Sequence, residues 1–333
     1  MKFGRKSYLW GILASFSFLS VLLTANISFA AATVEVTGKS LNEGTPPVYT
    51  SGNTIRVTGE ALSATGWETL ALTTLDFALE LENGQTSIPN KAMYNNGYLT
   101  SLTSNNVTTV GADAFAASVL TSVTLPVATA IGEAAFATSN LASVSLPLVK
   151  TIGSRAFSGT PLTSVSLPVA TEIGDFAFNE CTRLTSVSLP VAATVGTRTF
   201  YGSGLMDINL PATTAIGSQS FLNSSQLKSA TLPAVRTIGD RAFEGCVTLG
   251  ELHLDNADPA TGTDAFKNVP SGLLIYTNKK TLKGTAYPAG YKLVTSGESS
   301  GGGCNTGVGG ALAIFAAWTA LKRRKNEGVR ANT

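Results

Sequence analysis

A regular alternation of apolar and polar positions recurs along the middle of the chain. In the segment that begins at Leu141, apolar residues occupy the first, fourth and sixth positions, and Ser143 and Ser145 flank the central valine. Alternation of this kind indicates a short strand with one buried face. Pro147 then ends the strand, because proline has no N–H group to donate to a neighbouring strand.

The second half of the segment holds a smaller set of apolar positions. Ile152 provides the next inward contact, and Gly153 follows it directly. Glycine permits backbone angles or a close approach that a Cβ atom would forbid, so we expect a turn or a tight contact there. Phe157 closes the segment from the side opposite the strand.

This segment is one copy of an internal repeat. Its copies are spaced 21 or 22 residues apart, with leading leucines at Leu120, Leu141, Leu162, Leu184, Leu205 and Leu227. Weaker copies begin at Leu99, at Leu249 and at about Leu75, where Ile88-Pro89 stands in place of Ile-Gly. One copy buries about five large apolar side chains, worth on the order of 10 kcal/mol, whereas ordering each residue costs roughly 1–2 kcal/mol. A single copy therefore cannot fold, and neighbouring copies must stack.

Stacking turns equivalent side chains into columns and equivalent strands into a sheet. The predicted phenylalanine column contains Phe115, Phe136, Phe157, Phe178, Phe200, Phe221, Phe243 and Phe266. We predict a solenoid with a parallel concave β-sheet, and with short strands, turns or 3-10 segments on its convex side. Little α-helix is expected except in the two terminal apolar segments.

The residue pattern of the repeat resembles that of a known family. Leu-Pro after the strand and the pattern IGxxAF in the second half are similar to the BspA-type, or Treponema-type, leucine-rich repeats. The resemblance implies a leucine-rich-repeat solenoid in a bacterial surface protein, adhesin-like, that binds host matrix proteins or other bacteria. Most units of the family carry a cysteine three residues after the phenylalanine, whereas here only Cys181 and Cys246 do.

These two cysteines are not expected to form a disulfide bond. They occupy equivalent positions three units apart, and three strand spacings of about 4.8 Å separate them by roughly 14 Å. The Cα atoms of a disulfide lie within roughly 7 Å of each other. We therefore predict two free, buried thiols.

The N-terminus has the three parts of a secretory signal. A basic start precedes an apolar run from Tyr8 to about Thr24, and small residues follow at Ser28 and Ala30. We expect signal peptidase to cut after Ala30. The alternative is an uncleaved membrane anchor, for which a run of roughly 17 residues is at the short limit.

The C-terminus carries a Gly/Ser linker, a GGGCN motif, an apolar stretch from Val308 to Leu321 and a basic cluster. The stretch covers roughly 21 Å of a roughly 30 Å hydrocarbon layer. This tail resembles the Synerg-CTERM and GlyGly-CTERM sorting signals. The resemblance implies processing by a rhombosortase-like intramembrane protease at Gly302, Gly303 and Cys304. A plain tail anchor is the alternative.

The expected organisation follows from these signals. We predict an exported protein at the cell surface, initially anchored in the membrane by its C-terminal segment, with the basic cluster on the cytoplasmic side. The predicted parts are a signal peptide (1–30), an N-terminal cap (31–74), the solenoid (75–272), a C-terminal cap (273–295), a linker (296–303), a sorting or anchor segment (304–325) and a cytoplasmic tail (326–333).

Charge argues against nucleic acid as a partner. Only 13% of the residues are charged, against a usual share of about 25%. Residues 31–300 contain 15 basic and 20 acidic side chains, a net charge of −5. Such a chain offers no basic surface for a phosphate backbone.

The sequence also predicts no catalysis, no cofactor and no metal. Serine and cysteine hydrolases place a histidine beside the nucleophile, and this chain has one histidine, His253. Glu251, His253 and Asp255 alternate along one strand and are expected to share its face. A metal site or an acid–base pair is one reading of that trio, and a polar end cap is the favoured one. The chain has no Walker loop, HExxH, GxSxG or EF-hand pattern.

Binding is expected on the concave sheet, where the third and fifth positions of each strand point outward. These positions hold Ser101, Thr103, Ser122, Thr124, Ser143, Ser145, Ser164, Ser166, Ser186, Ser188, Asp207, Asn209, Ser229, Thr231, Glu251 and His253. Such a face suits an extracellular protein or glycan ligand, although the hydroxyls are also good solvated strand residues. Stronger contacts are expected near Tyr201, Met206, Asp207 and Asn209, or near Trp67 in the N-terminal cap. The alternative function is a structural surface coat or spacer without a specific ligand.

Overall fold

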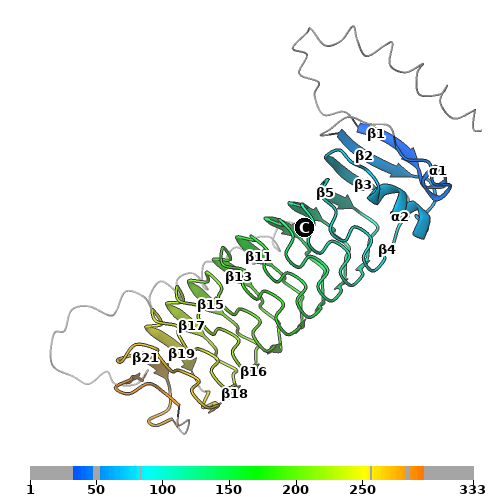
Figure 1. The fold of residues 1–333 in the computed structure, drawn as a ribbon. Helices are drawn as coiled ribbons and strands as arrows, with labels where there is room; N and C mark the ends of the chain where they lie inside the picture. Colours follow the sequence, from blue (N-terminus) through cyan, green and yellow to red (C-terminus); the bar gives the residue numbers. More distant parts are fainter. Residues whose placement is uncertain (1–32, 48–52, 83, 256, 283–285, 296–333) are drawn as a thin grey trace, which may run out of the picture. The chain divides into compact units, whose positions relative to one another are not determined.

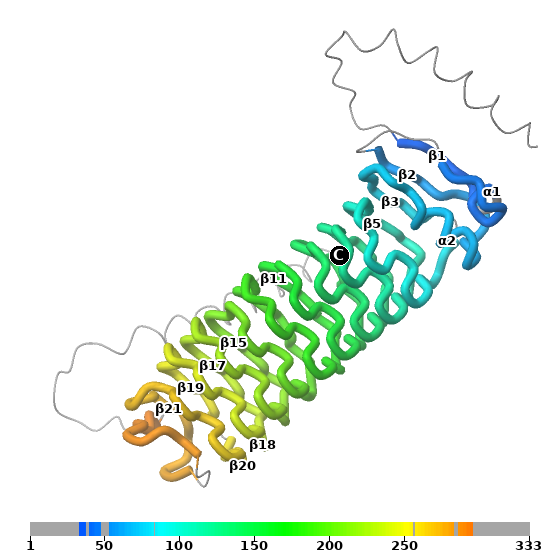
Figure 2. The backbone as a smooth tube through the Cα atoms, in the orientation of Figure 1, coloured from blue at the N-terminus to red at the C-terminus, as the bar shows by residue number. Residues whose placement is uncertain are grey.

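The computed structural model describes residues 33–47, 53–82, 84–255, 257–282 and 286–295. They form a stack of coils, each about one repeat long, as the backbone trace in Figure 2 shows. The predicted signal peptide, the linker and the sorting segment lie outside the described residues. Among the described residues, no helix combines the length and the apolar character needed to cross a membrane.

One side of every coil is a parallel strand, and these strands form the surface that we call the strand face (Figure 1). Its first six strands are β1 (Thr33–Thr37), β2 (Asn53–Thr58), β3 (Phe77–Leu81), β5 (Leu99–Ser104), β7 (Ser122–Thr124) and β9 (Ser143–Ser145). It continues with β11 (Ser164–Ser166), β13 (Ser186–Ser188), β15 (Asp207–Asn209), β17 (Ser229–Thr231), β19 (Glu251–Asp255), β21 (Leu274–Thr277) and β22 (Lys292–Val294). Because β9 lies beside β11 and β13 beside β15, the face runs through the whole stack.

A second parallel sheet of two-residue strands forms another side of the coils. It contains β4 (Ser87–Ile88), β6 (Thr109–Val110), β8 (Ala130–Ile131), β10 (Thr151–Ile152), β12 (Glu172–Ile173), β14 (Thr194–Val195), β16 (Ala215–Ile216), β18 (Thr237–Ile238) and β20 (Ala260–Thr261). Neighbouring strands pair with equivalent residues in register, as Ile131, Ile152 and Ile173 do. The parallel solenoid predicted from the repeat is therefore confirmed.

The third side of each coil follows the isoleucine-glycine pair and has an alternating hydrogen-bond pattern. The N–H groups of Arg155, Phe157 and Gly159 donate to carbonyl groups of the next coil at 2.8–2.9 Å. The intervening N–H groups of Ala156 and Ser158 donate back within their own coil. Every second residue of this segment thus donates a backbone hydrogen bond to the next coil.

This pattern requires left-handed backbone at a position where the chain has no glycine. The residue two places before each phenylalanine has a positive φ angle, for example Arg155 (56°) and Phe176 (59°). The full column is Asp113, Ala134, Arg155, Phe176, Arg198, Gln219, Arg241 and Asp264. Left-handed backbone costs an L-residue roughly 1–2 kcal/mol, so the hydrogen bonds between coils must offset that strain.

Gly153 is needed for close packing and not for a turn. A Cβ atom on Gly153 would lie 2.6 Å from the carbonyl carbon of Gly132, its equivalent in the preceding coil. Gly132 and Gly174 stand in the same relation to the coils before them, with 2.7 Å to the carbonyl carbon of Gly111 and 2.8 Å to that of Gly153. The sequence left two roles open for this glycine, a turn and a tight contact. The structure shows the tight contact.

The interior is one continuous apolar cluster along the stack. The eight phenylalanines of the predicted column stack face to face, with ring centroids 5.0–5.5 Å apart. One detail of the predicted alignment is wrong. Leu75 is 44% exposed, whereas the buried Phe77 pairs with Leu99 and takes the position of the leading leucine.

Two short helices near the start of the stack were not predicted. They are α1 (Gly38–Asn42) and α2 (Ala64–Ala71). Ser63 caps α2, because its side chain accepts the N–H of Gly66. The helix buries Trp67 and Leu70 against the first coils. Trp67 is therefore a core residue, and the expected ligand contact at its side chain is wrong.

Candidate functional site

The outward positions of the strand face form two straight rows across the coils. Strand pairing places equivalent residues in register: Ser122 opposite Ser143, and Thr124 opposite Ser145. The same register joins Ser164 to Ser186 and Ser166 to Ser188, and it joins Asp207 to Ser229 and Asn209 to Thr231. Strands of a sheet lie about 4.8 Å apart, so each row repeats a polar group at that interval.

The side chains of these rows are free to bind. Between β7 and β17 the described structure contains no hydrogen bond or ion pair within the chain to the side chain of Ser122, Thr124, Ser143, Ser145, Ser164, Ser166, Ser186, Ser188, Asp207, Asn209, Ser229 or Thr231. Other hydroxyls of the same coils are already used, since Thr121 and Thr185 donate to the preceding coil's carbonyl groups at 2.9 and 3.2 Å. The rows therefore keep their donors and acceptors for an external partner.

The rows are neutral except at β15. Asp207 and Asn209 are exposed there and replace the serine pair of the neighbouring strand β13. Ile208 between them is buried, so the strand keeps its register with β17. The exposed Met206 precedes Asp207. This carboxylate and amide pair is the one chemical irregularity in rows that otherwise consist of hydroxyls.

The rows end in charged or aromatic groups at both ends. Near the N-terminal end, Arg56 forms ion pairs with Glu80 at 2.9 Å and with Glu35 at 3.6 Å across three strands in register. Near the C-terminal end, the ring of His253 stacks on Tyr276 with centroids 4.3 Å apart. The hydroxyl section thus lies between two sections whose side chains already have partners.

The trio around His253 does not converge on a metal. His253 Nε2 lies 3.4 Å from Glu251 Oε2. The register shifts between His253 and Asp255, and Asp255 has a φ angle of 47°. The expectation that all three side chains share one regular strand face is therefore wrong at Asp255. No metal-binding group of three His, Cys, Asp or Glu residues occurs in the part of the chain that the structure describes.

Tyr201 does not belong to the strand face either. It lies beside Arg198, whose guanidinium carbon is 5.9 Å from the Tyr201 ring centroid and 5.7 Å from that of Phe176. Arg155 covers the same Phe176 ring at 4.7 Å. This group of arginines and aromatic rings was missed in the sequence, because its members belong to different copies and share only the segment that follows the Ile-Gly pair.

Cys181 and Cys246 are free and buried, as predicted. Each Sγ donates to a carbonyl group of the preceding coil, Cys181 to Phe157 at 3.0 Å and Cys246 to Phe221 at 3.1 Å. Burial raises the pKa of the Cys181 thiol to about 11 and the pKa of the Cys246 thiol to about 12. Neither group is a nucleophile at neutral pH.

We expect iodoacetamide to label both thiols slowly in the native chain at pH 8. Each unit of raised pKa lowers the thiolate population about tenfold, so Cys181 should react about 100-fold more slowly than a thiol in denaturant. The raised pKa of Cys181 also contributes stability that is fully present below about pH 9 and is lost as the pH rises toward 11. Mass spectrometry of the two cysteine peptides measures the rates, and equal rates in the native and denatured chain would contradict the burial.

The fold and the polar rows define a leucine-rich-repeat solenoid with an open strand face. Residues 73–171 and 150–271 match the family model described as "BspA type Leucine rich repeat region (6 copies)". The chain therefore belongs to the BspA-type leucine-rich-repeat family. No curated protein is similar enough to this chain to count as a match.

Solved structures of three bacterial proteins are similar to parts of this chain. A leucine-rich cell surface protein of Faecalibacterium prausnitzii is 19% identical, with 81% of this chain and 88% of that chain covered and a TM-score of 0.38. The T. pallidum leucine-rich-repeat protein is 23% identical over 58% and 78% of the two chains, with a TM-score of 0.34. The pneumococcal vaccine antigen PcpA is 15% identical over 81% and 84%, with a TM-score of 0.38.

Proposed function

We propose that this chain is a bacterial cell-surface, adhesin-like protein that binds an extracellular protein or glycan through the strand face. The observation that carries the proposal is the pair of rows between β7 and β17, whose twelve side chains have no hydrogen-bond partner in the described structure. An extended ligand that repeats its own polar groups would meet a donor or acceptor on each strand. Membership of the BspA-type family supports the same proposal.

Export to the surface is the second part of the proposal. The N-terminal signal would be removed by signal peptidase after Ala30, and the C-terminal segment would hold the chain in the membrane. A rhombosortase-like protease would then process the tail at Gly302, Gly303 or Cys304.

Specific binding should depend on β15. Exchanging Asp207 and Asn209 for serine makes this strand identical in its outward positions to β13. A double variant, Asp207→Ser with Asn209→Ser, should weaken binding at least tenfold, because the loss of one charged hydrogen bond is worth about 1.5–3 kcal/mol. The measurement is retention of the full chain on a panel of extracellular-matrix proteins and on a glycan array.

A matched control lies on the second sheet. Glu172 and Thr194 are exposed there on neighbouring strands, away from the strand face. Exchanging both for serine should leave retention unchanged. Equal loss in both double variants would mean that general surface polarity, and not β15, determines binding.

The uniformity of the rows also supports a second function. Six of the twelve outward residues form identical serine pairs on β9, β11 and β13. Such uniformity suits a surface coat or spacer whose outer groups need only be hydrated. Retention of the native chain by no member of the panel or the array would favour the coat.

A further inference from the structure

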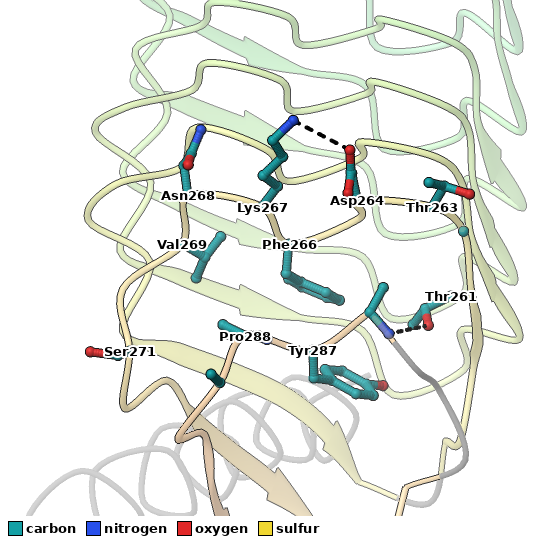
Figure 3. Close-up of a pocket in the computed structure, with 13 residues that line it drawn as sticks. Thr261, Thr263, Asp264, Phe266, Lys267, Asn268, Val269, Ser271, Tyr287 and Pro288 are labelled. Carbon is teal, nitrogen blue, oxygen red and sulfur yellow. Dashed lines mark hydrogen bonds and ion pairs between the residues drawn. The ribbon is translucent and has the colours of Figure 1, made fainter.

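The C-terminal end of the stack has a cavity that the proposed function does not use. Its volume is about 690 Å³, and it lies between the coil of Thr261–Val269 and the segment Ala286–Ala289 (Figure 3). In the described residues, β20 is the last strand of the second sheet, whereas the strand face continues through β21 and β22. The strand face therefore extends beyond the end of the second sheet, and the cavity lies where the second sheet ends.

Among the described residues, three backbone N–H groups of this coil lack the acceptors that the equivalent groups of the preceding coil have. In the preceding coil, Arg241, Phe243 and Gly245 donate to the carbonyl groups of Thr263, Ala265 and Lys267 at 2.8–2.9 Å. The equivalent donors one coil later belong to Asp264, Phe266 and Asn268. No acceptor for these three N–H groups is present among the described residues.

All three residues with free N–H groups line the cavity. The left-handed backbone of Asp264 (56°) and Asn268 (62°) shows that this coil keeps the conformation that directs alternate N–H groups toward the next coil. Three donors at every second residue match the carbonyl groups of one extended or coil-like peptide. Phe266 is buried, and a buried N–H group without an acceptor is costly. Asp264 and Asn268 are exposed, so a ligand that supplies carbonyl groups would pair the inner donor and replace water at the outer two.

Tyr287 fills only part of the space above this coil. Its ring stacks on Phe266 with centroids 5.2 Å apart and so continues the phenylalanine column. Its hydroxyl is buried and has no hydrogen-bond partner within the described structure. The hydroxyl of Tyr287, which lines the same cavity, is thus a fourth polar group without a partner among the described residues.

Charges of both signs lie beside the cavity. Lys267 Nζ lies 3.3 Å from Asp264 Oδ2 and 3.6 Å from Glu244 Oε1. Free anions would meet two carboxylates and one ammonium group, so backbone donors alone do not make this an anion site. A neutral carbonyl acceptor suits the donors and avoids the carboxylates.

We propose that this end of the stack binds an uncharged peptide segment of a partner protein, which adds one partial coil to the solenoid. The peptide carbonyl groups accept from Asp264, Phe266 and Asn268, and a small residue lies beside Tyr287. Binding of this kind does not involve the strand face and does not depend on the proposed function.

The test uses the full chain and a synthetic peptide probe. The probe is residues 260–270 of this chain with Asp264→Asn, Phe266→Ala and Lys267→Gln, which make it uncharged. That segment presents the backbone carbonyl groups that accept from the preceding coil. Amide hydrogen exchange should be fast at Asp264, Phe266 and Asn268 in the free chain. Addition of about 1 mM probe should slow it at least tenfold at these three amides and leave Arg241, Phe243 and Gly245 unchanged.

Two controls make the test specific. A second peptide keeps Phe266→Ala and Lys267→Gln but carries Asp264→Pro and Asn268→Pro. It cannot adopt positive φ angles at those two positions, and it should give no protection. Thr263→Trp and Ser271→Trp, at exposed residues that line the cavity, should each abolish protection by the first peptide. Thr197→Trp, at the position equivalent to Thr263 within the stack, should leave it intact.

Four results would overturn the proposal. The first three are unchanged exchange at the three amides with 1 mM probe, equal protection by the proline peptide, and protection that persists in both cavity variants. Protection that disappears between 0.05 and 0.5 M salt would also contradict it, because screening weakens a charged contact and not a neutral one.

Discussion

The Gly153→Ala variant is expected to lower the free energy of unfolding by about 3 kcal/mol or more. The added Cβ atom would lie 2.6 Å from backbone atoms of the preceding coil, and no side chain there can move aside. The two coils must separate, and separation stretches the hydrogen bond from Gly153 N–H to the Ile131 carbonyl, now 2.8 Å long. Equilibrium unfolding in urea measures the loss.

Gly97→Ala is the matched control for this substitution. Gly97 has no positive φ angle, and a Cβ atom there would meet nothing within 4 Å. Alanine also loses less backbone entropy on folding, so the variant should be neutral or more stable by up to about 1 kcal/mol. A Gly153→Ala variant as stable as Gly97→Ala would show that the coils are not packed as closely as described.

Phe157→Ala is expected to cost about 3–5 kcal/mol, the second large effect. The ring is fully buried between Phe136 and Phe178, with centroids 5.4 and 5.3 Å away. Removing it opens a void in the middle of the column that backbone hydrogen bonds between coils prevent from closing. Because coils of a repeat protein depend on their neighbours, we expect amide exchange to accelerate most in the coils on either side of the void.

Phe176→Ala tests whether the effect belongs to the column. Phe176 is an aromatic residue two positions before Phe178, but it is only half-buried and packs against the guanidinium groups of Arg155 and Arg198. Its loss should cost about 1 kcal/mol or less, the scale of an exposed cation–π contact. Similar losses for Phe157→Ala and Phe176→Ala would contradict a continuous column.

The period of the sequence predicted the core of this fold. Leu141, Val144 and Leu146 alternate with serines, and the same spacing in every copy is enough to place one strand above another. Stacking then places each phenylalanine over its equivalent, as the rings of Phe136 and Phe157 show. These features could be predicted because they follow from apolar burial repeated at a fixed interval.

Features set by the backbone path could not be predicted in this way. Arg155 and Phe176 adopt left-handed backbone, although neither residue type favours it. Their conformation follows from hydrogen bonds to the next coil, which a single sequence does not reveal. Trp67 was misplaced for a related reason: helix α2, which buries it, has only a short and weak signal between Ser63 and Ala71.

The exposure of the side chains on the strand face could be predicted from the sequence, but the irregularities of that face could not. The alternation of each strand correctly places Ser164 and Ser166 on the exposed side, since every second side chain of a strand points the same way. The shift after His253 was not predictable, because it depends on how β19 pairs with β21. The cavity beside Tyr287 lies where the repeat ends, so no copy of the repeat motif could predict it.

The most direct test of the account is a hydrogen-exchange footprint of the full chain with a ligand that it retains from the matrix panel or the glycan array. The central claim is that ligands bind across the strand face around β15. We predict slower exchange in β13, β15 and β17 on ligand binding, and loss of that protection in the double serine variant at Asp207 and Asn209. Protection confined to the second sheet, from β12 to β16, would contradict the claim.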